Sequence, residues 1–186
     1  DRPSEPRLVL LAQTRRGYGN LVRWVTAARR RAPKGTYRAY RADIEGREPH
    51  LPMLAGLPGC FVLLVPAAGQ GVESLFDHAM WLKTWVGVER AAIAVEQRHH
   101  PLDGVLLAVL QRVSGITGLP LVAAGGVRMH VRSRKALADV LTATKLKATV
   151  AGAGLALQPN AEAHLRTRTR LAALYRPEWL EQTLRI

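Results

Sequence analysis

Short apolar runs alternate with longer amphipathic stretches along this chain, and this alternation constrains the fold more than any other feature. The runs cover residues 8–12, 60–65, 91–95 and 121–124 and are short enough to be strands. Strands that alternate with helices are typical of parallel α/β architecture. We therefore expect an α/β fold with parallel strands, as a small open sheet or part of a barrel, in which the first two strands are buried.

The stretches between the runs predict the helices. In the first stretch, apolar residues at helical spacing form an inward face, and basic residues follow at its end, where they suit the helix dipole. That inward face consists of Leu21, Trp24, Val25 and Ala28. Further helices are expected at 73–85 and 102–113, after an N-cap at Ser133, after an N-cap at Asn160, and from Pro177 onward. Residues 32–59, rich in Pro, Gly and charge, predict a long irregular connection.

The apolar stretches and the cysteine content point to the cytoplasm. The longest apolar stretch, 60–68, contains Pro66 and is much shorter than the about 20 residues that a membrane-spanning helix needs. Residues 1–7 are polar, so no signal peptide is expected there. A single cysteine, Cys60, excludes an internal disulfide and any multi-cysteine zinc site, which suits a reducing compartment. Because the chain does not begin with Met, we expect it to be a piece of a longer protein.

The chain is strongly basic, with 27 Lys and Arg against 14 Asp and Glu and a net charge of +13. Such an excess favours a polyanionic partner, and nucleic acid is the commonest one. Only five of the basic residues are Lys, however, and an arginine-rich composition is equally typical of a GC-rich genome. Charge alone therefore leaves DNA binding as one of two interpretations.

Catalytic motifs are sparse in this sequence. It has no Walker-type phosphate loop, no nucleophile elbow and no His-Glu-x-x-His pair. Residues 69–71, Gly-Gln-Gly, form a weak phosphate-loop pattern that an ordinary loop explains better. His99 and His100 lie in a predicted turn, and His130 follows the fourth strand, where parallel α/β folds build sites. Solvated or backbone-bonded histidines explain these three at least as well, and the same holds for His50, His78 and His164.

Around the fourth strand the sequence resembles a known family. Residues 119–134, continuing through 136–137 to 139–141, look like one segment of the PHP (polymerase and histidinol phosphatase) domain of bacterial C-family DNA polymerases, in particular the error-prone alpha-subunit-like branch. Further segments agree in order along the chain: 8–12 with 17–21, 59–60, and 159–162 with 164–166. The resemblance implies an incomplete distorted (β/α)7 barrel of PHP type. It implies a partial PHP barrel domain at 1–150 and a helical segment at 151–186 that closes it.

The family binds a cluster of metal ions through His, Asp, Glu and Cys in its active members, and this chain departs from that pattern. Where the family has an Asp, this chain has Gly126, and where it has a His, this chain has Arg128. Glycine offers no side-chain ligand, and a protonated guanidinium repels a cation. Cys60 matches a family ligand position, but one thiolate does not hold a divalent ion alone; it is equally a small buried apolar residue. We therefore expect no catalytic residue, metal or cofactor in this chain, while Mg²⁺ would belong to the parent polymerase.

Two groups of residues are candidates for nucleic-acid contact. Aromatic and basic residues interleave at Tyr37, Arg38, Tyr40 and Arg41, as in proteins that bind single strands. Basic residues also gather before a predicted helix, at Arg132, Arg134 and Lys135, where backbone N–H groups attract phosphate. Solvated loops explain both groups equally well.

The resemblance implies part of an error-prone DNA polymerase, a nucleotidyltransferase that copies damaged DNA during repair. The expected partners are DNA and the rest of the polymerase chain, with no membrane, and an incomplete barrel with open edges is expected to self-associate. Two alternatives stay open. One is a free-standing PHP-type metal-dependent phosphoesterase, against which Gly126 and Arg128 argue. The other is a small basic α/β module that binds nucleic acid or protein.

Overall fold

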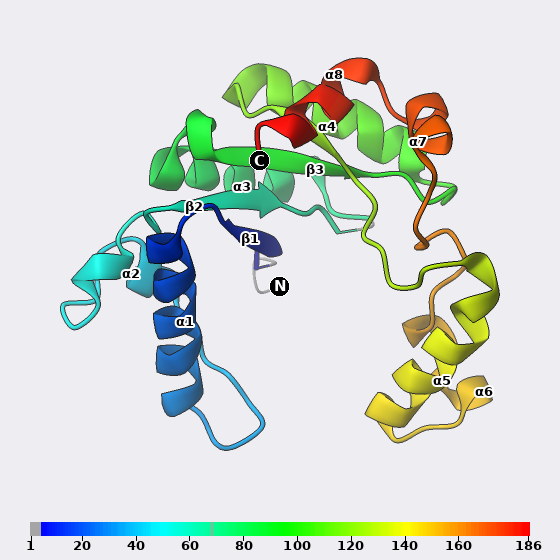
Figure 1. Ribbon diagram of the computed structural model, residues 1–186, viewed down its shortest axis with the longest axis horizontal. Coiled ribbons are helices and arrows are strands. Elements are labelled where there is room, and N and C mark those ends of the chain that lie inside the picture. Colours follow the sequence, from blue (N-terminus) through cyan, green and yellow to red (C-terminus); the bar gives the residue numbers. More distant parts are fainter. Residues whose placement is uncertain (1–4, 68) are drawn as a thin grey trace.

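One mixed sheet organises the chain (Figure 1). The computed structural model describes residues 5–67 and 69–186, and within them four strands lie in the order β1-β2-β3-β4. The strands are β1 (Leu8–Ala12), β2 (Cys60–Leu64), β3 (Ala91–Glu96) and β4 (Leu121–Ala124). All four therefore form where the apolar runs predict them, and the α/β class is confirmed, as an open sheet. Residue 68, the last of the longest apolar stretch, and residues 1–4 lie outside the described residues.

The expectation that all strands are parallel is wrong for β1. β2, β3 and β4 run parallel, whereas β1 pairs antiparallel with β2, with Ala12 opposite Cys60. The reason is the connection between them. Helix α1 (Arg15–Arg30) leads away from the sheet and residues 31–59 return to the same end, so β2 starts where β1 stopped. The parallel pairs instead have a single crossover helix that carries the chain back along the sheet.

Helices α3 (Val72–Val86) and α4 (Asp103–Thr117) cover one face of the sheet and enclose the main core. Alternate strand residues point toward them because side chains in a strand alternate between faces. The strand side of this core is Val62, Leu64, Ile93, Val95 and Leu121, and the helix side includes Leu75, Ala79, Leu82, Leu110 and Val113. Full burial of each large aliphatic side chain contributes about 1.5–3 kcal/mol.

The opposite face of the sheet is covered only in part. Phe61, Ala92 and Val122 form a small buried cluster there, against which Ile186 packs. Helix α8 (Pro177–Glu181) lies beside β4 and begins at Pro177, as predicted, and its Trp179 is part of the main core. On β1, Val9 and Leu11 of this face are exposed, so the expectation of a buried first strand is wrong.

The long connection 32–59 contains helix α2 (Arg41–Ile44) and is anchored by the side chain of Asp43, which is 1% exposed. This carboxylate accepts hydrogen bonds from Nε1 of Trp24 at 3.0 Å, from the Arg31 guanidinium at 2.6 and 2.7 Å and from the backbone N–H of Tyr40 at 3.1 Å. Burial alone raises the pKa of Asp43, but these donors lower it below its usual value of 3.8. A polar anchor thus ties α1 to α2.

Helices α5 (Lys135–Leu146) and α6 (Val150–Ala153) pack on each other in a lobe that stands away from the sheet (Figure 1). Two chain segments join this lobe to the sheet, and we call them the outgoing connector, 125–131, and the returning connector, 157–167. They pair with each other, because Arg128 N–H donates to Ala163 O at 2.8 Å and Leu165 N–H donates to Met129 O at 3.1 Å. The returning connector leads into α7 (Arg168–Leu174).

Both N-caps predicted in this region are wrong. Ser133 lies inside a 3₁₀ turn (Arg132–Arg134), and α5 starts after Arg134. Asn160 lies in the returning connector, and Thr167 caps α7 by accepting from Arg170 N–H. In the part of the chain that the structure describes, no helix has the length and apolarity needed to cross a bilayer.

Candidate functional site

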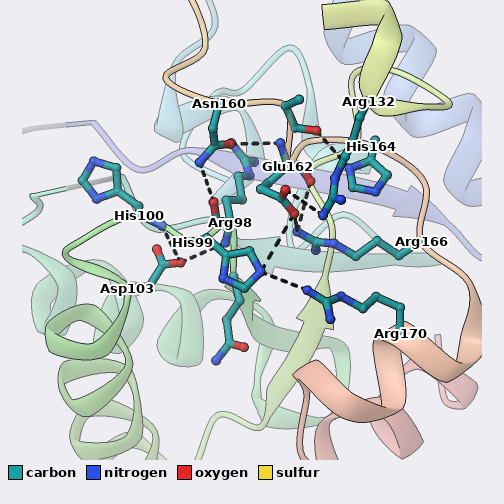
Figure 2. A network of polar contacts seen from close by, with 12 residues as sticks. Arg98, His99, His100, Asp103, Arg132, Asn160, Glu162, His164, Arg166 and Arg170 are labelled. Atoms are coloured by element: carbon teal, nitrogen blue, oxygen red, sulfur yellow. Dashed lines mark hydrogen bonds and ion pairs between the residues drawn. The ribbon is translucent and has the colours of Figure 1, made fainter.

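Polar side chains gather where the two connectors meet the carboxyl ends of β3 and β4 (Figure 2). This is the edge at which parallel α/β sheets build sites. The cluster draws residues from the loop after β3, the start of α4, the 3₁₀ turn that follows the outgoing connector, the returning connector and α7. Its labelled members are Arg98, His99, His100, Asp103, Arg132, Asn160, Glu162, His164, Arg166 and Arg170.

The carboxylate of Glu162 lies at the centre of this cluster. It accepts from Arg132 at 2.9 Å and from Arg166 at 3.3 Å, and Nε2 of His99 lies 3.9 Å away. Burial raises the pKa of Glu162, but hydrogen bonds from Arg132 and Arg166 outweigh it and lower the pKa below the usual value of 4.5. Glu162 is therefore ionised and engaged, which makes it a positioning group and a poor general base.

Arginines outnumber carboxylates around Glu162. The Arg166 side chain is only 2% exposed, and its Nε lacks a hydrogen-bond partner among the described residues. Arg170 makes a single side-chain contact there, from its Nη2 to Nε2 of His99 at 3.4 Å. The arrangement is therefore suited to holding an anion.

The loop after β3 is fixed by two polar side chains. Asp103 accepts from the backbone N–H groups of Arg98 and His100 at 2.9 and 3.0 Å. The amide of Asn160 donates to Arg98 O at 2.8 Å, and its oxygen accepts from Glu162 N–H at 2.9 Å. These bonds join the loop to the returning connector, so the cluster has a defined geometry.

Tyr175, just after α7, binds the ends of two strands. Its hydroxyl donates to Ala124 O at 2.8 Å and accepts from Gln97 N–H at 3.3 Å. Burial raises the pKa of this phenol, so it stays protonated at neutral pH. Tyr175 therefore connects the C-terminal part of the chain to the site edge.

A pocket of about 650 Å³ lies beside the cluster, between the sheet edge and the α5–α6 lobe. Its polar lining includes Arg7, Glu96, Arg98, His100, Lys135 and Asn160. Arg98 is ion-paired with Glu96, and its Nη2 also lies 3.5 Å from Gly126 O. A guanidinium thus lies against the loop that follows β4.

The structure does not bring Cys60 together with Gly126 and Arg128. The strand register gives the separation. Cys60 lies four residues before Leu64 of β2, and Leu64 pairs with Ile93 of β3. Glu96 lies three residues after Ile93 and pairs with Ala124, the last residue of β4 before the loop. These seven positions along the strands correspond to about 23 Å, so the Cys60 thiol and the loop after β4 lie at opposite ends of the strands. The thiol donates to Gly17 O at 3.4 Å, and burial raises its pKa. Its surroundings are those of a small apolar residue.

The first predicted nucleic-acid group is engaged within the chain. Arg29 stacks on Tyr37, Arg31 on Tyr40 and Arg41 on Trp81, with guanidinium-to-ring distances of 5.1, 5.3 and 4.5 Å. Each ring therefore has a guanidinium of the same chain over it, while Tyr37 and Tyr40 remain 58% and 51% exposed. Arg38 makes no side-chain hydrogen bond or ion pair within residues 5–67 and 69–186.

The second predicted group is divided by the fold. Arg132 binds Glu162, and Lys135 pairs with Asp139 on α5 at 2.6 Å. Arg134 has no side-chain partner among the described residues and is exposed. Of this group, only Arg132 belongs to the cluster at the connectors.

The histidines are dispersed. His99, His100 and His164 reach the cluster, whereas His130 and His50 are exposed and His78 is buried against Gln70, at 3.0 Å between side chains. In residues 5–67 and 69–186, no three His, Cys, Asp or Glu side chains come close enough to share a metal ion. Gln70 of the Gly-Gln-Gly segment bonds Ser74 and His78 and so belongs to the start of α3.

Sequence reasoning missed the central residues of the cluster: Arg98, Glu162, Arg166 and Arg170. The signal for two of them was the spacing of Glu162 and Arg166, an acid and a base four residues apart. On a helix this spacing is an ordinary surface pair. Here the pair lies in an irregular connector, and the local sequence does not distinguish such a connector from a helix.

Comparison with known proteins gives one consistent result. No family model matches the chain. The chain is 46% identical over 186 residues to the error-prone DNA polymerase of Dechloromonas aromatica, 43% identical over 179 residues to that of Bordetella parapertussis and 42% identical over 187 residues to that of Ralstonia nicotianae. These alignments cover 97%, 96% and 100% of this chain.

The chain spans only 17% of the length of each of these curated relatives. Over nearly all of its length it is therefore similar to one segment of proteins named error-prone DNA polymerase, and most of each relative has no counterpart in it.

Proposed function

We propose that this chain is a structural and DNA-contacting segment of an error-prone DNA polymerase, derived from the PHP domain and without metal-dependent cleavage of its own. The observation that carries the proposal is the similarity to polymerases of that name along nearly the whole chain. The complete protein would be a Mg²⁺-dependent nucleotidyltransferase acting in translesion synthesis in the cytoplasm. Its partners would be DNA and the remainder of the polymerase chain.

The topology is consistent with a piece of a PHP barrel. Strands β2, β3 and β4 are parallel, and α3 and α4 cross over between them on one face, as in a (β/α) barrel. The sheet is open, with β1 and β4 as its edge strands. In the proposed parent, further strands would continue the sheet from such an edge.

The residues at the site edge do not fit a PHP metal cluster. Gly126 provides no ligand, and a Cβ placed on it would approach Nη2 of Arg98 closer than 3.0 Å, so the guanidinium fills the space of the family's Asp side chain. Arg128 adds a second cation in the same loop, and Cys60 lies at the opposite end of the strands. Of the three carboxylates of the cluster and its neighbouring pocket, Glu96 and Glu162 are paired with arginines, and Asp103 accepts from backbone N–H groups. We therefore assign this segment a supporting role and no catalytic step.

DNA contact is supported by an unpaired stripe of arginines on α1. Arg16, Arg23 and Arg30 recur every seven residues, which places them on one side of the helix about 10.5 Å apart. All three are exposed, and none has an ion-pair partner within the described residues. Two of them, Arg16 and Arg23, line a shallow groove together with Arg15 and the exposed ring of Tyr18. Such a surface attracts phosphates and offers a ring for base stacking.

The test is fluorescence anisotropy of a labelled single-stranded oligonucleotide titrated with the 186-residue chain at several salt concentrations. Binding should weaken steeply with salt, and the triple variant Arg16→Ala, Arg23→Ala, Arg30→Ala should flatten the log–log slope by about 2, since each lost contact contributes about 0.7. A charge-matched control, Arg112→Ala, Lys145→Ala, Arg185→Ala, removes three exposed cations elsewhere.

The control variant should retain most of the salt dependence. Absence of binding by the unaltered chain at low salt would refute DNA contact. The absence of a catalytic role is tested separately: elemental analysis should find less than one Zn or Mn per chain after dialysis, and release of phosphate from a chromogenic ester should equal the blank. Several bound ions with metal-dependent release would instead support a phosphoesterase.

A further inference from the structure

We infer that Arg132, Arg166 and Arg170 form a binding site for a phosphate group. A pocket of about 370 Å³ is lined by these three arginines together with His164, Leu165 and Thr167. We call it the arginine pocket. It shares no lining residue with the pocket of about 650 Å³ beside the cluster.

The charges around the arginine pocket are unbalanced. Three guanidinium groups share one nearby carboxylate, that of Glu162, which binds Arg132 and Arg166. Arg170 contacts only the ring nitrogen of His99. A second anion in the pocket would offset this excess, and its attraction would be stronger than at an open surface because the Arg166 guanidinium is almost fully removed from water.

Arg166 is also incompletely bonded. Its Nη2 donates to the carboxylate and to the carbonyl oxygen of Glu162, at 3.3 and 3.1 Å, but its Nε has no partner among the described residues. A buried donor without a partner destabilises the folded chain. The fold therefore holds a cation at this place without satisfying it, which is typical of groups kept for a ligand.

Two of the three arginines, Arg132 and Arg166, are held in position before any ligand arrives. Arg132 follows the outgoing connector, Arg166 belongs to the returning connector, and Arg170 lies in α7. The connectors are paired by backbone hydrogen bonds, and Glu162 fixes two of the three side chains. Such preorganisation lowers the entropy lost on binding.

The chemistry of the pocket selects phosphate. A phosphate presents several acceptor oxygens in a tetrahedron, and guanidinium groups arriving from separate elements can each donate to a different oxygen. The phosphate could belong to a DNA strand or to a free nucleotide. The inference does not rest on the proposed polymerase role, because inorganic phosphate alone suffices to fill the site.

The experiment is isothermal titration of the full chain with inorganic phosphate at low ionic strength, with chloride at equal ionic strength as the blank. Arg170→Ala removes an exposed guanidinium and should weaken phosphate binding about tenfold or more. Arg134→Ala is the matched control, because Arg134 is exposed, close to Arg132 in sequence and absent from the pocket lining. It should bind phosphate like the unaltered chain.

A second variant guards against unfolding. Arg166→Lys keeps the buried charge but loses the planar group, and should weaken phosphate binding while the circular dichroism spectrum stays unchanged. Equal phosphate affinity in the Arg170→Ala and Arg134→Ala variants would overturn the inference. Undetectable binding of phosphate by the unaltered chain at a phosphate concentration on the order of 10 mM would also overturn it.

Competition distinguishes the sources of the phosphate. A 5′-phosphorylated oligonucleotide that displaces phosphate better than its unphosphorylated form identifies a strand end, and a deoxynucleoside triphosphate that displaces it best identifies a free nucleotide. Either result supports the site. The α1 triple variant should keep its phosphate affinity, so failure of the DNA-contact proposal and failure of this one give different results.

Discussion

The Arg98 guanidinium occupies the space that any side chain at position 126 would need. A Cβ built on Gly126 would come closer than 3.0 Å to Nη2 of Arg98 and to Oε1 of Glu96, and Gly126 has a φ of +52°, which favours glycine. The ion pair between Arg98 and Glu96 therefore depends on the glycine at position 126, because it fills the space that a larger residue there would need.

This relationship predicts the cost of substituting Gly126. Gly118 has a φ of +76°, and a Cβ built on it would meet no atom within 4 Å. Gly118→Ala should therefore destabilise the fold by about 1 kcal/mol, the cost of the left-handed backbone alone. Gly126→Ala should destabilise by about 1–2 kcal/mol more, because it also displaces the ion pair. Urea denaturation measures both.

A double-mutant cycle checks the cause. In an Arg98→Ala background, the extra penalty of Gly126→Ala over Gly118→Ala should disappear. An unchanged penalty there would show that the guanidinium is not responsible.

Two glycines of α1 should respond in opposite directions. A Cβ on Gly17 would come closer than 3.0 Å to the carbonyl oxygen of Gly59, a backbone atom that cannot turn aside, whereas a Cβ on Gly19 meets nothing within 4 Å. Gly17→Ala should therefore destabilise by about 2–3 kcal/mol through overpacking, and Gly19→Ala should stabilise by up to about 1 kcal/mol through helix propensity. Thermal unfolding of both variants tests the pair; equal melting temperatures would contradict the close docking of α1 on β2.

Asp43 predicts a pH dependence of stability. Its pKa is lowered in the folded chain, so its contribution is fully present above the ordinary value near 3.8 and is lost as the pH falls below that value toward the lowered one. At pH 7, Asp43→Asn should destabilise the fold by about 2–3 kcal/mol, because Arg31 loses the nearer of its two charged partners, Asp43 and Glu48. The difference between the unaltered chain and the variant should shrink below about pH 4. A difference that stays constant from pH 7 to pH 3 would exclude this role.

The chain is expected to self-associate through α5. Leu137 and Leu141 lie one turn apart on this helix and are 50% and 62% exposed, on a lobe that no other helix of the described chain besides α6 covers closely. In sedimentation velocity, the sedimentation coefficient should increase with protein concentration. The double variant Leu137→Gln, Leu141→Gln should abolish this increase. Ile116→Gln, at an equally exposed apolar residue of α4, should leave the association unchanged. A dilute and a concentrated sample that both sediment as monomer would refute the prediction.

The strands could be located from sequence because their signal is local. Residues 8–12 and 121–124 are strands with the predicted bounds, since apolar β-forming residues bounded by polar or turn residues need no distant information. The direction of β1 could not be predicted, because it depends on how the segment 31–59 returns, and that path is set by the buried anchor at Asp43. Caps were misplaced for a similar reason: Asn160 has the right chemistry for a cap but bonds Arg98 O, 62 residues away.

The candidate site was only partly within reach of sequence reasoning. Arg132 was identified as basic and near a helix start, but its partner Glu162 lies 30 residues later and reaches it only because the connectors pair. Arg29 of α1 lies over Tyr37 and Arg31 lies over Tyr40, and the composition of the group at 37–41 does not reveal these contacts. Composition describes which contacts are possible, and tertiary structure decides which of them are made.

The paired connectors have a mechanical consequence. A lobe on a single tether can rotate about individual backbone bonds, but two tethers that are hydrogen-bonded to each other resist twisting and leave mainly one bending motion. Arg132 directly follows one tether and Arg166 lies on the other, so an anion bound between them would stiffen that remaining motion as well. The orientation of the α5–α6 lobe and the occupancy of the arginine pocket would then be thermodynamically linked, each favouring the other.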